Sequence, residues 1–295
     1  MEVRILRPRP KESEDLFLAI LLYKGERIMT HFLGALKPKA DVRDYRVAAA
    51  AAEYPESYLC ENLPPVKNQR SVSSCVAHAT SSILEAFNKT ETGHFVPLST
   101  NFIYGMQGVA FGRLEGGMYL RDACKIVKDY GDASESAIGG NTEQPKCTEW
   151  LKEKLTDEIY NEAKNYRIAS YAKCKSANDL KHALMNYGPV LGSIKWYDKY
   201  TIKDKIITFD KNVDYGYHAI MICGWNEKGW ICQNSWGRTW NGDGIFIYPF
   251  EEQFTELWSF VDAENDDIVV PKNNNWLNYV YKLINYVINL IKGKR

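Results

Sequence analysis

A change in the period of the apolar residues near Gly188 and Pro189 constrains the fold of this chain more than any other feature. Before that point, apolar residues recur at helical spacing in several stretches. After it, short apolar or aromatic runs are separated by Gly, Asn and Asp, which is typical of strands joined by turns. A helical part followed by a strand-rich part predicts an α+β fold with a seam between two lobes, and active sites commonly lie in such seams.

Individual elements follow from the same patterns. Helices are predicted over residues 73–87, 98–107, 118–129, 148–165 and 177–187. The side chain of Ser73 or Ser74 is expected to cap the first of them. Strands are predicted over residues 190–196, 217–225, 230–234 and 244–248.

The chain is expected to divide into an N-terminal segment, two lobes and an extension. We place these parts at residues 1–50, 51–170, 171–262 and 263–295. The alanine run at 48–52, which closes the first part, suits either a processing site or a short helix.

Composition excludes several classes of protein. The 295 residues are 45% hydrophobic and 13% aromatic, so low-complexity disorder is excluded for the main body. The formal net charge is zero, without the basic footprint of a nucleic-acid-binding protein. Seven cysteines without a C-x-x-C pair give no support to a zinc site, and no metal or cofactor is expected.

Cys75 is the strongest candidate for a nucleophile. A thiol in the first turn of a helix faces the positive end of the helix dipole and unpaired backbone N–H groups, which favour the thiolate. Such a nucleophile needs a base within hydrogen-bond reach and a group that orients that base.

His218 is the histidine best placed to be that base. It begins a predicted strand, and a hairpin turn at residues 226–229 would bring Asn234 beside it, with Trp236 shielding the pair from water. His78 lies on the same predicted helix as Cys75 and leaves little room for a substrate, so we interpret it as a packing residue. His31 lies in the N-terminal segment, and the two other histidines have polar surroundings typical of a surface.

These segments resemble the papain-like cysteine peptidases. The likeness covers residues 55–250 and rests on Pro64-Pro-Val-Lys-Asn-Gln69 before Cys75, on the strand that carries His218, and on Asn234-Ser-Trp-Gly237. Cys75 and His218 are about 140 residues apart, within the range of this family. The resemblance implies the two-lobe papain-like fold, with a helical lobe, a β-barrel-like lobe and the active site in the cleft between them.

The resemblance also implies roles for individual residues. Cys75 would be the nucleophile, His218 the general base and then acid, Asn234 the group that orients His218, and Gln69 an oxyanion donor. Gly116 and Gly117 would expose backbone to an extended substrate, although a simple turn is the alternative. Other residues expected at the substrate are Met118, Ser193, Ala219 and Trp236.

The expected function is therefore hydrolysis of peptide bonds in protein or peptide substrates through an acyl-enzyme on Cys75, in a zymogen whose residues 1–50 block the cleft. A catalytically idle peptide-binding relative and a thiol acyl or amide transferase remain alternatives. The first cysteine and the tryptophan of the family's CGSCW motif are absent, so its usual disulfide cannot form. This resembles bacterial, archaeal and viral members.

Two features at the ends of the chain complete the analysis. Residues 276–292 place apolar side chains near helical period beside basic residues, which suits a helix docked on the body or, as we favour slightly, a contact with a membrane surface or a partner. Acidic residues precede the apolar run at 16–23, where a signal peptide carries basic ones. An intracellular or virion-associated location is therefore favoured over a secreted or lysosomal one.

Overall fold

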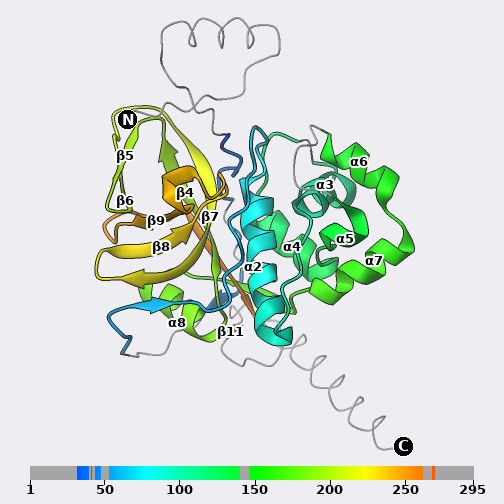
Figure 1. The fold of residues 1–295 in the computed structure, drawn as a ribbon, viewed down its shortest axis with the longest axis horizontal. Helices are drawn as coiled ribbons and strands as arrows, with labels where there is room; N and C mark the ends of the chain where they lie inside the picture. The colour runs from blue at the N-terminus through cyan, green and yellow to red at the C-terminus, as the bar shows by residue number, and fades with distance from the viewer. Residues whose placement is uncertain are drawn as a thin grey trace, which may run out of the picture.

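The structure is a computed structural model that describes residues 32–39, 41, 44–47, 53–113, 115–139 and 146–261 and the backbone of residues 268 and 269. Helices gather on one side and strands on the other, and α2 (Cys75–Thr92) runs along the seam between them (Figure 1). This arrangement confirms the α+β class and the two lobes predicted from the sequence. The expectations for residues 1–31, 48–52 and 276–292 lie outside the described residues.

The helical lobe is built from elements whose ends follow local sequence signals. Helix α2 ends at Gly93, whose left-handed φ of 74° lets its N–H reach the Lys89 carbonyl. Ser99 caps the next helix by accepting a hydrogen bond from the Phe102 N–H. The helices of this lobe after α2 are α3 (Thr100–Phe111), α4 (Leu120–Asp129), α5 (Glu135–Ile138), α6 (Cys147–Lys154), α7 (Asp157–Ala163) and the 3₁₀ turn η1 (Lys164–Tyr166). Helix α8 (Ala177–Asn186) packs instead against the sheet of the other lobe (Figure 1).

Two predictions about helix boundaries are wrong. Residues 148–165 form not one helix but α6 and α7, because the side chain of Thr156 accepts a hydrogen bond from the Ile159 N–H and starts a new helix. The side chain of Ser74, which occupies the residue before α2, makes no capping hydrogen bond. Its hydroxyl instead lies 3.3 Å from Nδ1 of His78, a fully buried residue, as expected for a packing role.

The strands form one mixed sheet in the order β11-β1-β3-β10-β4-β7-β8-β9-β6-β5, with β2 beside β7. Its centre is the antiparallel pair β4 and β7, in register from Val190↔Ile222 to Tyr197↔Tyr215. The predicted strands correspond to β4, β7, β8 and β9. The full set is β1 (Arg46–Val47), β2 (Tyr58–Leu59), β3 (Ser170–Lys173), β4 (Val190–Tyr197), β5 (Tyr200–Lys203), β6 (Ile206–Phe209), β7 (Tyr215–Asn226), β8 (Gly229–Gln233), β9 (Ile245–Tyr248), β10 (Glu256–Val261) and β11 (Ile268–Val269), with a short 3₁₀ turn η2 (Trp240–Gly242) between β8 and β9.

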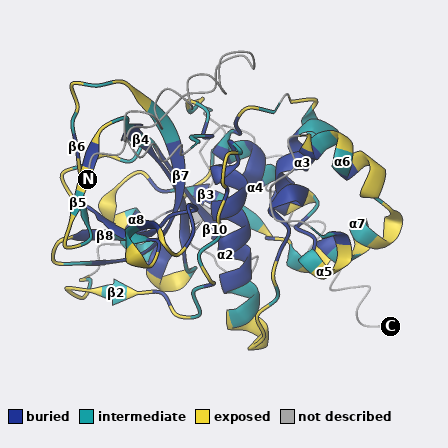
Figure 2. Ribbon diagram, turned by 45° about the horizontal axis from the view of Figure 1, so that its top comes forward, coloured by how far each residue is buried: buried dark blue, intermediate teal, exposed yellow. Residues whose placement is uncertain are grey.

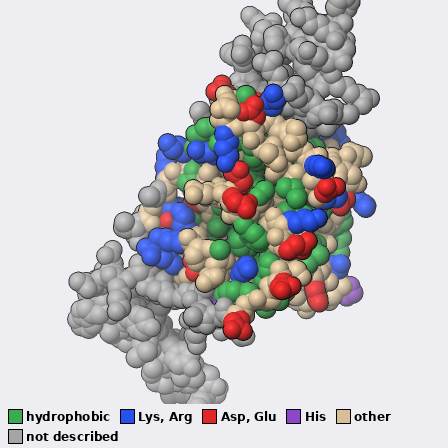
Figure 3. Space-filling view, turned by 90° about the vertical axis from the view of Figure 1, so that its left-hand side faces the viewer, with side chains coloured by type: hydrophobic (Ala, Val, Ile, Leu, Met, Phe, Trp, Pro, Cys, Tyr) green, Lys and Arg blue, Asp and Glu red, His purple; other side chains and the backbone are tan. Residues whose placement is uncertain are grey.

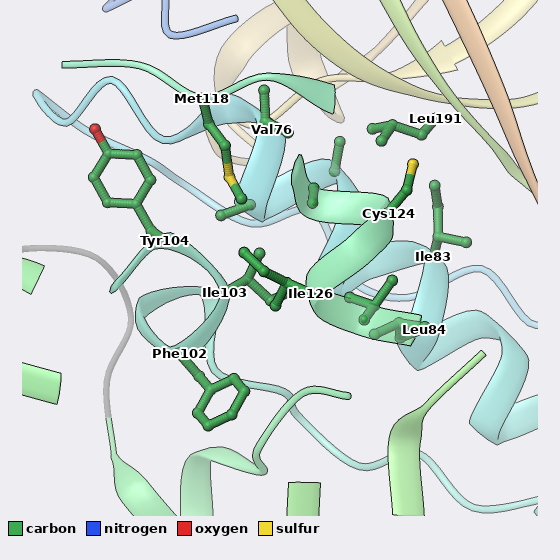
Figure 4. Close-up of a cluster of buried hydrophobic side chains, with 14 of the residues drawn as sticks. Val76, Ile83, Leu84, Phe102, Ile103, Tyr104, Met118, Cys124, Ile126 and Leu191 are labelled. Atoms are coloured by element: carbon green, nitrogen blue, oxygen red, sulfur yellow. The ribbon is translucent and has the colours of Figure 1, made fainter. Parts of the chain in front are cut away.

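Helix α2 is the common wall of both lobes. It is buried along most of its length (Figure 2), and its apolar side chains meet α4 and the sheet in one core. Figure 4 shows Val76, Ile83 and Leu84 of α2 gathered near Ile126 of α4 and Leu191 of β4. Each fully buried aliphatic side chain contributes about 1.5–3 kcal/mol. The start of α2 is therefore held rigidly against β7.

Residues 32–39, which we call the strap, cross the seam at the start of α2. Ala35 forms a parallel bridge to Met118 on one side and an antiparallel bridge to Tyr217 on the other. Beyond the strap, the guanidinium of Arg121 forms an ion pair with Asp41 at 3.2 Å, and the Arg121 side chain is only 16% exposed. The strap thus spans both lobes and is anchored beyond its end.

Candidate active site

The thiol of Cys75 lies at the first residue of α2 and is fully buried. The backbone N–H of Ala219 points at its sulfur from 3.4 Å. Because Ala219 directly follows His218 on β7, this contact places the sulfur against the backbone of the strand that carries the histidine. The antiparallel sheet and the first turn of the buried helix therefore bring together two residues that are far apart in the sequence.

The imidazole of His218 is oriented by Asn234. Its Nε2 lies 2.7 Å from Oδ1 of Asn234, which follows β8 in the predicted hairpin. An amide oxygen only accepts hydrogen bonds, so Nε2 carries the proton and Nδ1 of the neutral ring is the basic nitrogen. Trp236 packs over the imidazole, with ring centroids 4.8 Å apart and planes 32° from parallel. The described structure thus assembles a thiol, a base with a fixed tautomer, and an apolar cover.

Gln69 lies in the same site and is itself oriented. Its Oε1 accepts a hydrogen bond of 2.6 Å from the Ser235 hydroxyl, which turns the amide N–H groups the other way. Nε2 donates to the carbonyl oxygens of Phe32, at 2.7 Å, and Val72, at 2.9 Å. A donor that holds a strap carbonyl at this position can also hold the oxygen of a substrate carbonyl.

The strap covers the sulfur and changes its acidity. Burial raises the pKa of the Cys75 thiol to about 11, and backbone N–H groups of Ala219, Gly34, Val76 and Ala35 only partly offset this effect. The sequence predicts a stabilised thiolate, but under the strap the thiol is protonated because water cannot reach it. Backbone N–H groups of Gly34 and Ala35 face the sulfur, so the strap covers it directly.

Gly34 is the position where the strap passes closest to the helical lobe. A Cβ atom built on it would lie 2.0 Å from the backbone oxygen of Ser73. Its carbonyl accepts a hydrogen bond of 2.7 Å from the N–H of Met118, and the Met118 carbonyl accepts one of 2.9 Å from Leu36. Only a residue without a side chain fits this crossing.

The paired glycines lie next to the strap, but not in the manner expected. Their N–H groups donate to the Tyr104 hydroxyl, from Gly116 at 3.0 Å and from Gly117 at 3.2 Å. Backbone pairing with the strap begins one residue later, at Met118, because Tyr104 occupies the two glycine donors. Gly117 still needs to lack a side chain, since a Cβ there would lie 2.9 Å from the Gly34 oxygen.

The structure places the remaining predicted substrate residues around this centre. Ser193 on β4 pairs in register with Ala219 on β7, and both are fully buried. Met118 is also fully buried and packs in the same core cluster as Ala35 of the strap. Trp236 lies beside the histidine and packs against Trp196 and Trp240, so its contacts are with the site's own wall.

Sequence reasoning missed two contributors, Tyr104 and Ser235, and predicted a third, the strap, only as part of a longer segment. Tyr104 and Ser235 hold backbone and amide groups in place, and the strap supplies the peptide that fills the cleft. Ser235 could have been suspected from its place directly after Asn234. The strap falls within residues 1–50, which the sequence predicts to block the cleft, although nothing in residues 32–39 marks them as the part that covers Cys75.

The described residues contain no cluster of His, Cys, Asp or Glu side chains that could hold a metal ion. None of the seven cysteines is paired in a disulfide. Within the same described ranges, no helix combines the length and apolar character needed to cross a membrane.

Comparisons with known proteins agree with this geometry. The profile described as "Papain family cysteine protease" matches residues 56–254, which is more than half of the chain. The chain is similar to the cathepsin B-like cysteine proteinase 3 of Caenorhabditis elegans, with 24% identity over 83% of this chain and 69% of that protein.

Two solved structures share the fold. Xylellain, a cysteine protease from Xylella fastidiosa, has a TM-score of 0.68 and 23% identity, with 79% of this chain and 96% of that chain covered. Digestive procathepsin L 3 of Tenebrio molitor has a TM-score of 0.58 and 18% identity, with 76% of each chain covered.

Proposed function

This chain belongs to the papain family of cysteine proteases, and on that premise we propose that it hydrolyses peptide bonds through Cys75 once the strap has left the cleft. The observation that carries the proposal is the arrangement of three side chains. The Cys75 sulfur lies against the β7 backbone at Ala219, the residue after His218, and the His218 ring is held by Asn234. The substrates of such an enzyme are proteins or peptides.

The geometry supports a reaction in two halves. Nδ1 of His218 takes the proton of the Cys75 thiol, and the sulfur bonds to the carbonyl carbon of the substrate. The oxygen becomes an anion that Gln69 Nε2 and the Cys75 backbone N–H stabilise. The C–N bond then breaks, the leaving amine takes the proton from Nδ1, and an acyl group remains on sulfur.

Water completes the cycle. Nδ1 of His218 takes a proton from the water as its oxygen attacks the thioester carbon. The C–S bond breaks, the sulfur is released as the thiolate or recovers the proton, and the carboxylic acid product leaves. Asn234 keeps Nε2 protonated throughout, so the same ring nitrogen acts in both halves.

The strap makes the full chain a zymogen in this proposal. The Phe32 carbonyl occupies the Gln69 donor, and Gly34 and Ala35 cover the sulfur with N–H groups. A substrate carbonyl cannot enter while these contacts persist. The similarity in fold to a procathepsin supports this assignment.

The first experiment compares three proteins on a fluorogenic dipeptidyl amide: the full chain, a version lacking residues 1–40, and that version with Cys75→Ala. The shortened protein should hydrolyse the amide and lose activity after treatment with an epoxide inhibitor of cysteine peptidases. The Cys75→Ala protein should not hydrolyse the amide. A folded shortened protein that binds the peptide without cleaving it would instead support an idle peptide-binding relative.

Hydrolysis and transfer share the acyl-enzyme, so the acceptor separates them. Adding an amino acid amide as a competing acceptor and analysing products by mass spectrometry distinguishes the two. We expect the free acid to dominate; a dominant new amide would assign transferase activity.

The face of the β-rich lobe in Figure 3 carries basic and acidic side chains interspersed, which supports a protein substrate over a nucleic-acid partner.

Two further statements stay predictions from the sequence. The first, an intracellular or virion-associated location, is tested by cell fractionation followed by immunoblotting. The contact of residues 276–292 with a membrane or partner is tested by liposome flotation with and without residues 272–295.

A further inference from the structure

An apolar groove lies at the end of α2 that is remote from Cys75. It has a volume of about 380 Å³ and lies between the last turns of α2, strand β2, the end of α8 and the end of β10. Its lining includes Phe87 and Phe260, together with Leu59 and Met185, which are 51% and 42% exposed. Large apolar side chains left this open beside one another commonly mark a contact surface.

The direction of strand β11, at the edge of the sheet, points the C-terminal part of the chain toward this groove. Strand β10 runs toward it and ends at Val261, which lines it. Strand β11 is antiparallel to β1, β1 is parallel to β3, and β3 is antiparallel to β10. Strand β11 therefore runs in the same direction as β10, and the residues after Val269 start toward the groove end of the sheet.

The distance is short enough for the following residues to reach the groove. Strands β11 and β10 are three steps apart in the sheet, about 15 Å at ordinary strand spacing. Residues 270–275 can span about 20 Å when extended. The apolar segment that begins at Trp276 can therefore start at the groove.

The sequence of residues 276–292 suits a concave apolar surface. Its polar residues up to position 289 are Asn278, Lys282, Asn285 and Asn289, whose spacing places them in one narrow stripe of a helix. Aliphatic and aromatic residues cover the rest of the helix. A helix that is apolar around most of its circumference needs a groove rather than a flat face, because a groove contacts more than one side of it.

Charge agrees with this fit. The groove is lined by the carboxylates of Glu61 and Glu91 and by one guanidinium, that of Arg167. Residues 272–295 carry five basic residues and no acidic one. Attraction between the segment and the groove adds to the burial of apolar surface.

We propose that residues 276–292 of this chain dock as a helix in the groove formed by α2, β2, α8 and β10. The groove lies on the body of the same chain, within reach of β11, the strand that leads into the segment. Its apolar lining and its acidic side chains match the apolar and basic residues of the segment. A membrane surface, for which the sequence alone gives a slight preference, would have to compete with this adjacent site.

Limited trypsin digestion of the full-length Cys75→Ala protein tests the proposal without self-cleavage. The bond after Lys282 lies within the docked helix and should be protected. The double variant Leu59→Asp and Met185→Asp should be cut there at least about ten times faster, because two charges enter the apolar contact. Phe95→Asp is the matched control, since Phe95 is 40% exposed and does not line the groove; it should behave like the parent.

A second measurement leaves the body of the protein unchanged. Ile284→Asp alters only the segment, and it should raise hydrogen exchange of the backbone amides at residues 184–188 in the groove wall. Equal trypsin rates in parent and double variant, together with unchanged exchange, would overturn the proposal. Protection that appears only with anionic phospholipid vesicles would assign the segment to membranes, and protection that grows with protein concentration would assign it to a second copy; either result also overturns it.

Discussion

Replacing Gly34 by alanine should activate the full chain without removing any residue. The added Cβ would lie 2.0 Å from the backbone oxygen of Ser73, two residues before the buried start of α2, so the strap must move. Gly34 is not in a left-handed conformation, and the effect is therefore steric rather than conformational.

The magnitude follows from the hydrogen bonds that the strap loses. Three backbone bonds hold its centre: Met118 N–H to the Gly34 carbonyl at 2.7 Å, Leu36 N–H to Met118 at 2.9 Å, and Ala35 N–H to Tyr217 at 3.2 Å. At about 1 kcal/mol each, their loss destabilises the covered state by about 3 kcal/mol. The population of open cleft, and with it the initial rate, should rise about a hundredfold.

The assay is the initial rate of fluorogenic amide hydrolysis by the full chain, with intact mass measured at each time point to exclude self-cleavage. Lys37→Ala is the control, because Lys37 is exposed on the same strap. It should leave the rate unchanged. If Gly34→Ala hydrolyses the amide no faster than the parent while the version lacking residues 1–40 is active, the close approach to Ser73 is not what holds the strap in place.

Other perturbations test the chemistry and the anchor. Gln69→Ala should lower kcat/KM of the shortened enzyme by about 10²–10³ through kcat, and a change confined to KM would contradict its oxyanion role. Because burial raises the pKa of Cys75 to about 11, its thiolate forms only as pH rises toward that value, so the ultraviolet absorbance of this thiolate, taken as the difference between the full chain and its Cys75→Ala variant, should keep rising from neutral pH upward; a plateau at neutral pH would contradict the pKa shift. Arg121→Ala should lower the free energy of unfolding by about 1.5–3 kcal/mol in urea titrations, because its partly buried ion pairs with Asp41 and Asp44 are lost. Arg113→Ala, at a side chain 44% exposed, should cost less than about 1 kcal/mol, and equal losses would refute the distinction.

Much of the fold was predictable because its signals are local. Helix α8 begins with a capping box made by Ser176 and Asp179 and ends before Gly188, and both signals stand in the sequence. The hairpin of β7 and β8 turns at Asn226 and Gly229, as its composition predicts. These elements carry their own start and stop residues.

Elements that depend on distant partners were not predictable in this way. Strand β10 is buried on every residue and lies between β3 and β4, so its six residues show no alternation of polar and apolar side chains. The break between α6 and α7 rests on Thr156, whose side chain could equally have pointed to solvent within a longer helix. Pairing and packing choose between such alternatives, and neither is visible in a short window.

The candidate site divides along the same line. Cys75, His218, Asn234 and Gln69 stand in motifs, and the described structure brings them together. Their supports were harder to predict: Ser235 stands in the same motif as Asn234 but acts on Gln69 across 166 positions of sequence separation, and Tyr104 stands in no motif. The acidity of the thiol also depends on what covers it. The rule that a helix N-terminus lowers the pKa of a thiol therefore predicts the wrong direction for Cys75 under the strap, where burial raises its pKa.

Strand β1 follows the inhibitory strap in the chain and is itself part of the sheet. Arg46 and Val47 pair with β11 on one side, and Arg46 pairs with β3 on the other, so they form an interior strand of the sheet. A single proteolytic cut between the strap and β1 would release the inhibitory peptide. The new amino terminus would lead directly into β1, which stays hydrogen-bonded in the sheet. Maturation would then remove Ala35 from the core shared with Met118 but leave the pairing of β1 intact, so the mature enzyme would melt below its precursor and keep its sheet.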